Sequence, residues 1–420
     1  MQINGEIRDM CSEMRHLLPV NVAFLCGAGT SCHMRLCDND DYPVPMDSTF
    51  MFCAREIANW CTNDTVKEIG RQAFTSVIRN LTQHGVMEND LFPVGSSRPE
   101  VSMEEAFCRL EMLRMLGVDT SDGRWRHSVD SFRDLIAIVL SQGNLPSDNL
   151  QGGYHGLVRG LAANRMQRNA MILTLNYELG IEQAIATHFN DQPNMYPLAE
   201  SMMSDGMISH NELYYYHFPN RNMPRSEAIP VMKLHGSCNW AYCPDCQNVQ
   251  WSMEPDGSLD ITRLLPNESH QERCYWHSVD EGLRPKYIAH VVAPTWNKWM
   301  GDYTLRHIWR GSHYALNRVR ALFVIGTSLP TTDSHLRHLF HLTVSRDMRQ
   351  IPPVVYVVNP VEEAGRIDYL DRLNNVLGLS ITDDSDKCRW TGFEDPDTIA
   401  WIIDRASRHV VTDVTTTITY

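Results

Sequence analysis

Two polar side chains stand where short apolar runs of the sequence end, and both are of types that could take part in catalysis. Asn176 follows the run 171–175, and His235 follows the run 231–234 and precedes a glycine. An imidazole changes its protonation state near neutral pH and can act as a general base, and an amide can orient a water or a hydroxyl group. A lone histidine is usually structural, and spacing alone favours a helix-capping role for Asn176.

A glycine-rich turn follows the first apolar run, residues 22–26. It consists of Gly27, Ala28, Gly29, Thr30 and Ser31. A glycine turn after a buried strand lets the backbone approach a phosphate closely, so that amide groups face the anion. The third glycine of the usual dinucleotide fingerprint is missing, and no acidic residue is convincingly placed about twenty residues on. Phosphate binding and a tight strand-to-helix turn with a serine cap both remain open.

Other polar residues occupy similar positions after apolar runs. Glu178 lies two residues beyond Asn176, and Asn359 follows the run 354–358. Gly326, Thr327 and Ser328 follow the run 321–325 and precede a helix that Asp333 could cap. Open α/β sheets bind ligands at the carboxyl ends of their strands, so these positions are candidate binding residues.

The elements that must position these residues are short strands alternating with helices. Apolar runs rich in Val, Ile and Leu recur at 22–26, 171–175, 231–234, 288–293, 321–325 and 354–358. They are mostly apolar on both faces, which is typical of parallel strands covered on both sides. With helical patterns between them, they predict an α/β fold with a doubly wound, Rossmann-like parallel sheet.

Within the 420 residues we expect a single domain with additions. The segment 49–144 has helix-spaced apolar residues and predicts an inserted helical layer. The segment 191–284 has weak periodicity and predicts a small irregular subdomain. A helix is also predicted near the start, over 7–18. A C-terminal extension over 380–420 contains a further predicted helix at 398–408.

Composition excludes several function classes. The formal net charge is −14, which argues against direct nucleic-acid binding. No run of 18 apolar residues is present, so no membrane span is expected. The N-terminal residues lack the pattern of a secretion signal, and the 12 cysteines are scattered. We therefore expect a cytoplasmic protein with mostly buried thiols.

One group of cysteines has the spacing of metal ligands. Cys243 and Cys246 are followed by Cys274 and His277 in a C-x₂-C…C-x₂-H arrangement. This arrangement suits a tetrahedral structural zinc site, and a closed four-ligand site leaves no position for chemistry. Cys238 is a possible substitute ligand, and free thiols in a loop are the alternative.

Taken together and in order, five pieces of the sequence resemble the sirtuin family. They are residues 27–31, 174–178, 233–237, 326–329 and Asn359. The resemblance spans roughly residues 20–360 and implies a Rossmann-like fold that uses NAD+. Sirtuins also commonly carry a four-cysteine zinc module after the His-Gly motif, where this chain has its cysteine group.

The resemblance also implies roles for the individual residues. Phosphates and ribose would be held by the turn 27–31 and by Thr327 and Ser328, with Gly326 beside them. Asn359 would face the adenosine ribose, and Asn176 and His235 would stand at the nicotinamide ribose. Glu178 falls where the family usually has an aspartate that contacts the nicotinamide amide.

The departures from the family narrow the expected activity. Protein-deacylating sirtuins follow the glycine turn with Asp-Phe-Arg and carry a Phe-Gly-Glu-type loop, and this chain has neither. The segment 291–298 is instead similar to the sirtuin-like NAD+ hydrolases of bacterial antiphage systems. This implies hydrolysis of NAD+ to nicotinamide and ADP-ribose. We expect the activity to be switched on by homo-oligomerisation, by a separate sensor or ATPase protein, or by both. The alternatives are an NAD+-dependent protein deacylase and a non-enzymatic NAD+ or ADP-ribose sensor.

Overall fold

The computed structural model describes most of the chain and leaves several segments out. The described residues are 20–92, 101–119, 127–166, 169–189, 229–242, 249–251, 259–264, 287–292, 303–329, 333–345 and 351–410. The helix predicted at 7–18, residues 411–420 and most of 191–284 lie outside them. Within the described part, no helix is both long and apolar enough to span a membrane.

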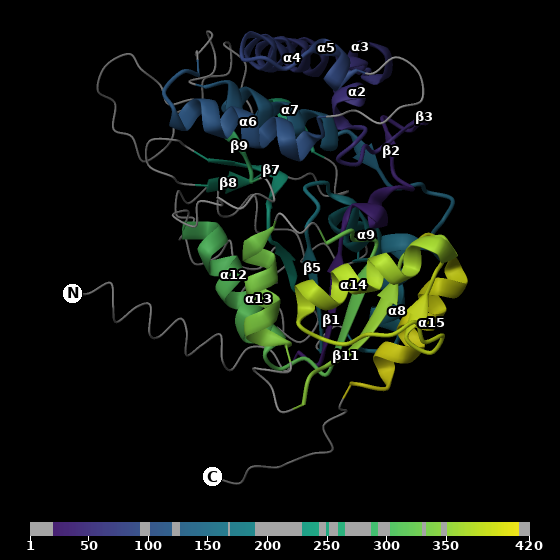
Figure 1. The fold of residues 1–420 in the computed structure, drawn as a ribbon. Helices are drawn as coiled ribbons and strands as arrows, with labels where there is room; N and C mark the ends of the chain where they lie inside the picture. Colours follow the sequence, from purple (N-terminus) through teal and green to yellow (C-terminus); the bar gives the residue numbers. More distant parts are fainter. Residues whose placement is uncertain are drawn as a thin grey trace, which may run out of the picture.

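A six-stranded parallel sheet forms one half of the molecule (Figure 1). In spatial order its strands are β12 (Cys388–Arg389), β11 (Val354–Val358), β10 (Ala321–Ile325), β1 (Val22–Cys26), β5 (Ala170–Thr174) and β6 (Val231–Lys233). If these six strands are renumbered 1 to 6 in chain order, their spatial order starting from β6 is 3-2-1-4-5-6. This is the strand order of the Rossmann fold. The chain switches direction across the sheet between β1 and β10. The predicted doubly wound α/β fold is therefore confirmed.

Helices cover both faces of this sheet. On one face lie α12 (Tyr303–Leu316), α13 (Ser334–Thr343) and α14 (Arg366–Leu377), the last preceded by the short 3₁₀ turn η3 (Glu363–Gly365). On the other face lie α8 (Gly153–Ala163), α9 (Gly180–Phe189) and α15 (Pro396–Ser407). Side chains of β1 alternate between the two cores: Leu25 packs with the first set and Phe24 with the second. This alternation explains why the strand reads as apolar on both faces.

A separate layer of helices stands above the carboxyl ends of the strands (Figure 1). Its elements are α2 (Phe50–Arg55), α3 (Ile57–Trp60), α4 (Asp64–Gln83), α5 (Glu88–Leu91), α6 (Met103–Met115) and α7 (Ser128–Leu140). They share one hydrophobic core, and nearly every residue of α7 is buried in it. Asn63 and Ser102 accept hydrogen bonds from the first turns of α4 and α6. These helices lie within the segment interpreted from the sequence as an inserted layer.

Two small antiparallel sheets connect the halves. One contains β3 (Asn39–Pro43), β2 (Arg35–Leu36) and β4 (Gly143–Asn144), and the other contains β8 (Val249–Trp251), β7 (Gly236–Tyr242) and β9 (Ile288–Val291). A single helical turn, α11 (Ile261–Leu264), packs near β7.

The expectation that 288–293 forms a strand of the parallel sheet is wrong. The segment forms β9, which pairs antiparallel with β7. It is buried because α7 covers it, and the Asp134 carboxylate of that helix accepts a hydrogen bond from the Ala289 amide at 2.9 Å. A short strand buried in this way has the same apolar pattern as a central parallel strand, so periodicity could not distinguish them.

The stretch interpreted as a C-terminal extension contributes to the sheet half. β12 pairs in parallel with β11, and α15 packs against α8. Asp395 caps α15 by accepting a hydrogen bond from the Asp397 amide, and Pro396 occupies its first turn. The predicted helix at 398–408 thus begins two residues earlier.

Candidate active site

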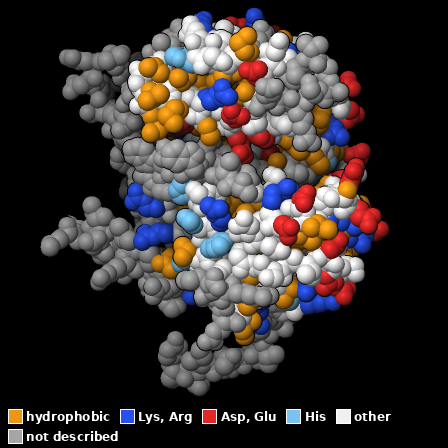
Figure 2. Space-filling model, viewed as in Figure 1, with side chains coloured by type: hydrophobic (Ala, Val, Ile, Leu, Met, Phe, Trp, Pro, Cys, Tyr) orange, Lys and Arg blue, Asp and Glu red, His pale blue; other side chains and the backbone are white. Residues whose placement is uncertain are grey.

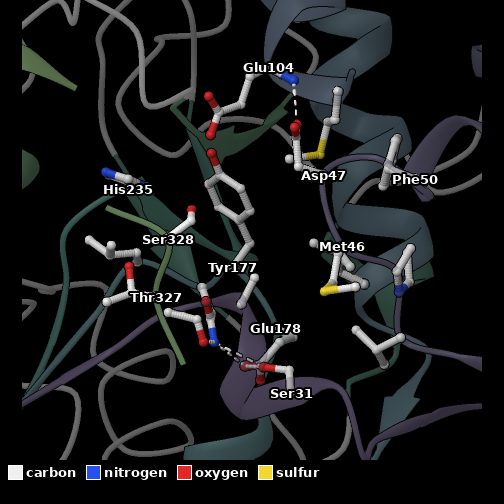
Figure 3. Close-up of a pocket in the computed structure, with 18 residues that line it drawn as sticks. Ser31, Met46, Asp47, Phe50, Glu104, Tyr177, Glu178, His235, Thr327 and Ser328 are labelled. Carbon is white, nitrogen blue, oxygen red and sulfur yellow. Dashed lines mark hydrogen bonds between the residues drawn. The ribbon is translucent and has the colours of Figure 1, made fainter. Parts of the chain in front are cut away.

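A pocket opens where the carboxyl ends of the parallel strands meet the helical layer (Figure 3). Its empty volume is about 780 Å³, including the space at its open mouth. The sheet side is lined by Gly27, Ala28, Ser31, Leu175, Asn176, Tyr177, Glu178, His235, Thr327 and Ser328. The layer side is lined by Val44, Pro45, Met46, Asp47, Phe50, Met103, Glu104 and Leu140. The pocket therefore brings together most of the candidate residues from four separate strand ends.

The remaining sheet-side candidates lie directly behind this lining. Gly29 and Gly326 contact each other through the hydrogen bond from the Gly29 amide to the Gly326 carbonyl, at 2.6 Å. Thr30 contributes its hydroxyl to the network described below. The Asn359 side chain donates to the Thr327 carbonyl at 3.3 Å and is not part of the lining.

The glycine turn after β1 interlocks with the turn after β10. A Cβ on Gly27 would lie 2.4 Å from the Cβ of Thr327, and a Cβ on Gly29 would lie 2.8 Å from the Gly326 oxygen. Gly326 itself has φ of +57°, a left-handed conformation that glycine adopts without strain. Close packing of the two turns is thus the structural reason for these three glycines. The residues 28–31 form a short 3₁₀ turn, η1 (Ala28–Ser31).

Replacing Gly27 by alanine is expected to destabilise the protein by about 1–3 kcal/mol, because the added methyl group meets Thr327 in a packed turn. Denaturant unfolding measures the change. Gly365→Ala is the control, since its added Cβ meets only a Val361 methyl group at 3.2 Å. Equal effects of the two substitutions would contradict the interlocked-turn interpretation.

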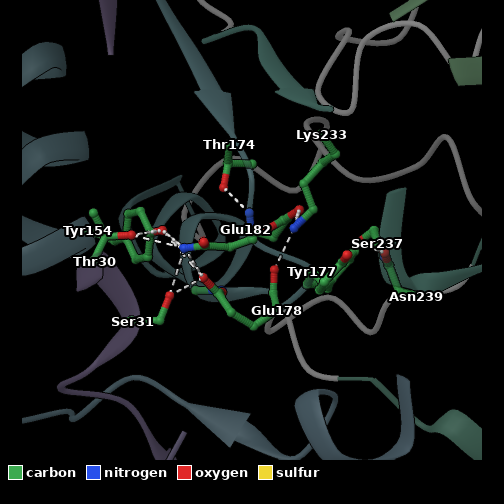
Figure 4. A network of polar contacts seen from close by, with 12 residues as sticks. Thr30, Ser31, Tyr154, Thr174, Tyr177, Glu178, Glu182, Lys233, Ser237 and Asn239 are labelled. Carbon is green, nitrogen blue, oxygen red and sulfur yellow. Dashed lines mark hydrogen bonds and ion pairs between the residues drawn. The ribbon is translucent and has the colours of Figure 1, made fainter. Parts of the chain in front are cut away.

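A buried polar network behind the pocket includes Thr30, Ser31 and Glu178 (Figure 4). The Asn176 amide contacts all three. Its Nδ2 lies 2.9 Å from Ser31 Oγ, 3.0 Å from Thr30 Oγ1 and 3.1 Å from Glu178 Oε1. It also lies 3.0 Å from the Gly27 carbonyl oxygen. One amide has two hydrogens, so it cannot donate to all of these acceptors at once. The Asn176 side chain therefore contacts the glycine turn. The sequence had left open that it caps the following helix, and in the structure its amide does not cap α9.

Glu178 takes the position at the start of α9 instead. Its carboxylate accepts hydrogen bonds from the Gly180 amide and from the Ser31 hydroxyl, and the Tyr154 hydroxyl lies 3.3 Å away. Burial, and next the charge of Glu178, raise the pKa of Tyr154 well above its usual value, so the phenol stays protonated and can donate. Tyr154 comes from α8, and no feature of its sequence neighbourhood pointed to this role.

His235 is held by a buried carboxylate. Its Nε2 lies 2.9 Å from Asp333 Oδ2, and the two residues are 2% and 1% exposed. The other oxygen, Asp333 Oδ1, accepts a hydrogen bond from the Leu336 amide at 2.9 Å and so caps α13, as predicted. A carboxylate at one ring nitrogen fixes the tautomer and the orientation of the imidazole. The pairing with Asp333 was not predicted, because the two residues are 98 positions apart.

A buried ion pair lies beneath the Asn176 loop. Lys233 Nζ is 3.0 Å from Glu182 Oε1, and it also donates to the carbonyl of Glu178. Both side chains are at most 1% exposed. Burial raises the pKa of Glu182, and the ammonium group of Lys233 opposes that rise. The ammonium group thus joins β6, α9 and the loop that carries Asn176.

The layer side of the pocket contains two carboxylates, those of Asp47 and Glu104 (Figure 3). Asp47 Oδ1 accepts a hydrogen bond from the Glu104 amide at 2.8 Å, and burial raises the pKa of Asp47. The Tyr177 ring lies between this wall and His235, and its hydroxyl donates to the Val292 carbonyl at 2.8 Å. These carboxylates come from the helical layer, and no pattern in the sequence indicated that residues of this layer would reach the site.

The predicted zinc ligands Cys243, Cys246, Cys274 and His277 all lie outside the described residues. The possible substitute, Cys238, is described: it is fully buried in β7 among apolar side chains, and burial raises its pKa. The described residues contain no group of three or more side chains that could hold a metal ion.

Comparison with known proteins gave similarity to solved structures only. No family model and no curated protein matches the chain. A Sir2 homologue in complex with NAD is 12% identical over 94% of both chains, with a TM-score of 0.40. An ADP-ribose complex of a mutant Sir2 homologue is 12% identical, covering 94% of this chain and 95% of that one, with a TM-score of 0.37. Sir2Tm bound to a propionylated peptide is 10% identical over 96% and 98% of the two chains, with a TM-score of 0.34. Identities of 10–12% and TM-scores of 0.40 or less do not assign a function to this chain, and the residues of the pocket are the basis for the function proposed below.

Proposed function

We propose that this chain is an NAD+ glycohydrolase, which cleaves NAD+ to nicotinamide and ADP-ribose. One observation carries the proposal. The buried His235–Asp333 pair and the Asn176 amide meet in one pocket with a glycine turn, at the point where a sheet of Rossmann order switches direction. Dinucleotides bind at this point in such sheets.

The binding of NAD+ follows from the sheet side of the pocket. The described lining contains no lysine or arginine, so the pyrophosphate would be held by backbone amides and by hydroxyl groups. Ser31, Thr327 and Ser328 supply those hydroxyls. Asn359, beside Thr327, would face the adenosine ribose. The turns are already packed against each other, so little ordering is needed when the ligand binds.

Cleavage breaks the bond between C1′ of the ribose and the nicotinamide nitrogen, and the bonding electrons leave with nicotinamide. The ribose passes through a state with oxocarbenium character, which carries positive charge. The carboxylates of Asp47 and Glu104 on the opposite wall stabilise such charge. Water attacks C1′ and gives its proton to His235, while Asn176 orients the water or the ribose hydroxyls.

The biological part of the proposal is depletion of NAD+ in antiphage defence, with activity switched on by oligomerisation or by a separate sensor or ATPase protein. An NAD+ hydrolase that was always active would harm its own cell, so dependence on an activating event is part of the proposal. A structural zinc ion at Cys243, Cys246, Cys274 and His277 is also proposed, on the spacing of these residues alone.

The test is chromatography of NAD+ incubated with the purified protein, with an acetyl-lysine peptide present in half of the samples. We expect nicotinamide and ADP-ribose without peptide, and a loss of about 10²–10⁴-fold in rate for His235→Ala. Asn176→Ala should lose activity as well. The matched control is Asn164→Ala, which changes an exposed asparagine after α8.

Two outcomes would replace this proposal by a different one. Nicotinamide release that requires the peptide and yields an acetylated ADP-ribose would indicate a deacylase. Measurable NAD+ binding with no cleavage in any assembly state would indicate a sensor.

A further inference from the structure

The surface of α12 and α13 is rich in positively charged side chains, although the chain as a whole is acidic. Residues 303–345 contain five arginines, no lysine and one carboxylate, and that carboxylate is Asp333, which is buried against His235. Figure 2 shows Lys/Arg and His side chains gathered over these two helices. We define the arginine face as Arg306, Arg310, Arg337 and His338, which are exposed or half-buried on α12 and α13. In a chain with a net charge of −14, such a concentration of one sign marks a surface for a negatively charged partner.

An acidic surface lies next to the arginine face, on the same side of the sheet. α14 packs against α13 and, together with η3, presents exposed carboxylates. We define the acidic face as Glu362, Glu363, Asp368 and Asp371. Arg372 is also exposed on α14, and Arg366 lies 5.2 Å over the Trp390 ring, so the carboxylates outnumber the cations there. Figure 2 shows acidic side chains in the region over α14.

Each of the two faces also exposes one large apolar side chain. Leu342 on α13 is 51% exposed, and Ile367 on α14 is 71% exposed. Protein interfaces combine an apolar centre with a polar rim and favour arginine over lysine. The absence of lysine from residues 303–345 thus points to a protein surface with carboxylates. Nucleic-acid binding uses lysine as well, and it is opposed by the overall charge of this chain.

We propose that two copies of this chain associate through this side of the molecule, with the arginine face of each copy against the acidic face of the other. The two faces lie side by side, so a two-fold axis between the copies forms both sets of contacts at once. Leu342 and Ile367 add exposed apolar surface to the same side of the molecule. This proposal names the surface through which the homo-oligomer expected from the sequence would form.

The location of this surface also connects it to the pocket. α13 begins directly after Asp333, whose carboxylate holds His235. A contact on α13 therefore acts on the same helix that positions the candidate base. The association itself does not depend on the proposed activity, and it is tested without it.

The experiment is light scattering and sedimentation of the full chain in about 0.1 M and about 1 M salt, because exposed charges are screened at the higher concentration. We expect a dimer that dissociates as salt rises. Arg306→Glu/Arg310→Glu should weaken dimerisation by about 100-fold or more, and Asp368→Arg/Asp371→Arg should do the same. Mixing the two variants should restore a dimer, since opposite charges then face each other at both contacts, with the native pairing at one and the reversed pairing at the other.

The matched control is Lys67→Glu/Arg71→Glu on α4, which has the same i, i+4 spacing and the same change in charge on the helical layer. It should dimerise as the wild type does. Circular dichroism establishes that each variant is folded. A wild type that stays monomeric in low salt, or a mixture that fails to associate, overturns the proposal. Binding of a single-stranded oligonucleotide that is lost in Arg306→Glu/Arg310→Glu, with no dimer in any condition, would instead identify a nucleic-acid surface.

Discussion

Replacing Asp333 by asparagine is expected to lower kcat for NAD+ cleavage by about 100-fold, while KM and the thermal midpoint change little. Asparagine has the same shape and caps helices as well as aspartate does, so α13 keeps its first turn. What is lost is the negative charge 2.9 Å from His235 Nε2, which fixes the tautomer and stabilises the protonated ring. Steady-state kinetics and calorimetric NAD+ binding separate these effects.

Two further variants make this prediction sharper. Asp333→Ala removes the cap as well and should cost about 1 kcal/mol of stability in addition to the rate. Asp333→Asn combined with His235→Ala should be no slower than His235→Ala alone, because residues that act as a unit are not additive. An unchanged kcat in Asp333→Asn would show that the charge of Asp333 does not assist His235 in the reaction.

Replacing Lys233 by methionine is expected to lower the free energy of unfolding by about 3–5 kcal/mol. The substitution leaves the carboxylate of Glu182 buried without its ammonium partner, in a place where burial already raises its pKa. It also removes a donor to the Glu178 carbonyl. Denaturant unfolding monitored by circular dichroism measures the change.

The double variant Lys233→Met/Glu182→Leu is the informative comparison for this pair. With both charges replaced by apolar groups, most of the lost stability should return. The same substitution at an exposed ion pair, Lys387→Met beside Asp384, should cost less than about 1 kcal/mol. If Lys233→Met were as mild as Lys387→Met, the pair would not stabilise the loop that carries Asn176.

Much of the parallel sheet could be predicted because its strands are apolar on both faces. The expected boundaries of β1, β10 and β11 match the structure, and those of β5 and β6 differ by one residue. β12 was missed because its two residues, Cys388 and Arg389, form no apolar run. β12 joins the sheet through backbone pairing with β11. Such pairing does not require apolar side chains, so the sequence pattern does not reveal it.

The candidate site was predictable only where residues follow strands directly. Gly27, Asn176, His235 and Thr327 line one pocket because parallel strands end at a common edge. The partners that hold these residues come from other elements. Tyr154 lies on α8, Asp47 precedes α2, and Asp333 starts α13. Their positions depend on how helices pack over long sequence separations, which single-sequence patterns do not encode.

The pocket lies at the boundary between two separately packed hydrophobic cores. Phe50, Leu140 and Tyr177 belong to the core of the helical layer, whereas Leu175 packs with the core of the sheet. Neither core contains the cavity by itself, so the cavity exists only while both are in place. A molecule bound there touches both halves and holds them together, adding to the stability of their junction in proportion to its own binding free energy. Loosening of the helical layer alone would thus abolish the cavity and leave the parallel sheet folded.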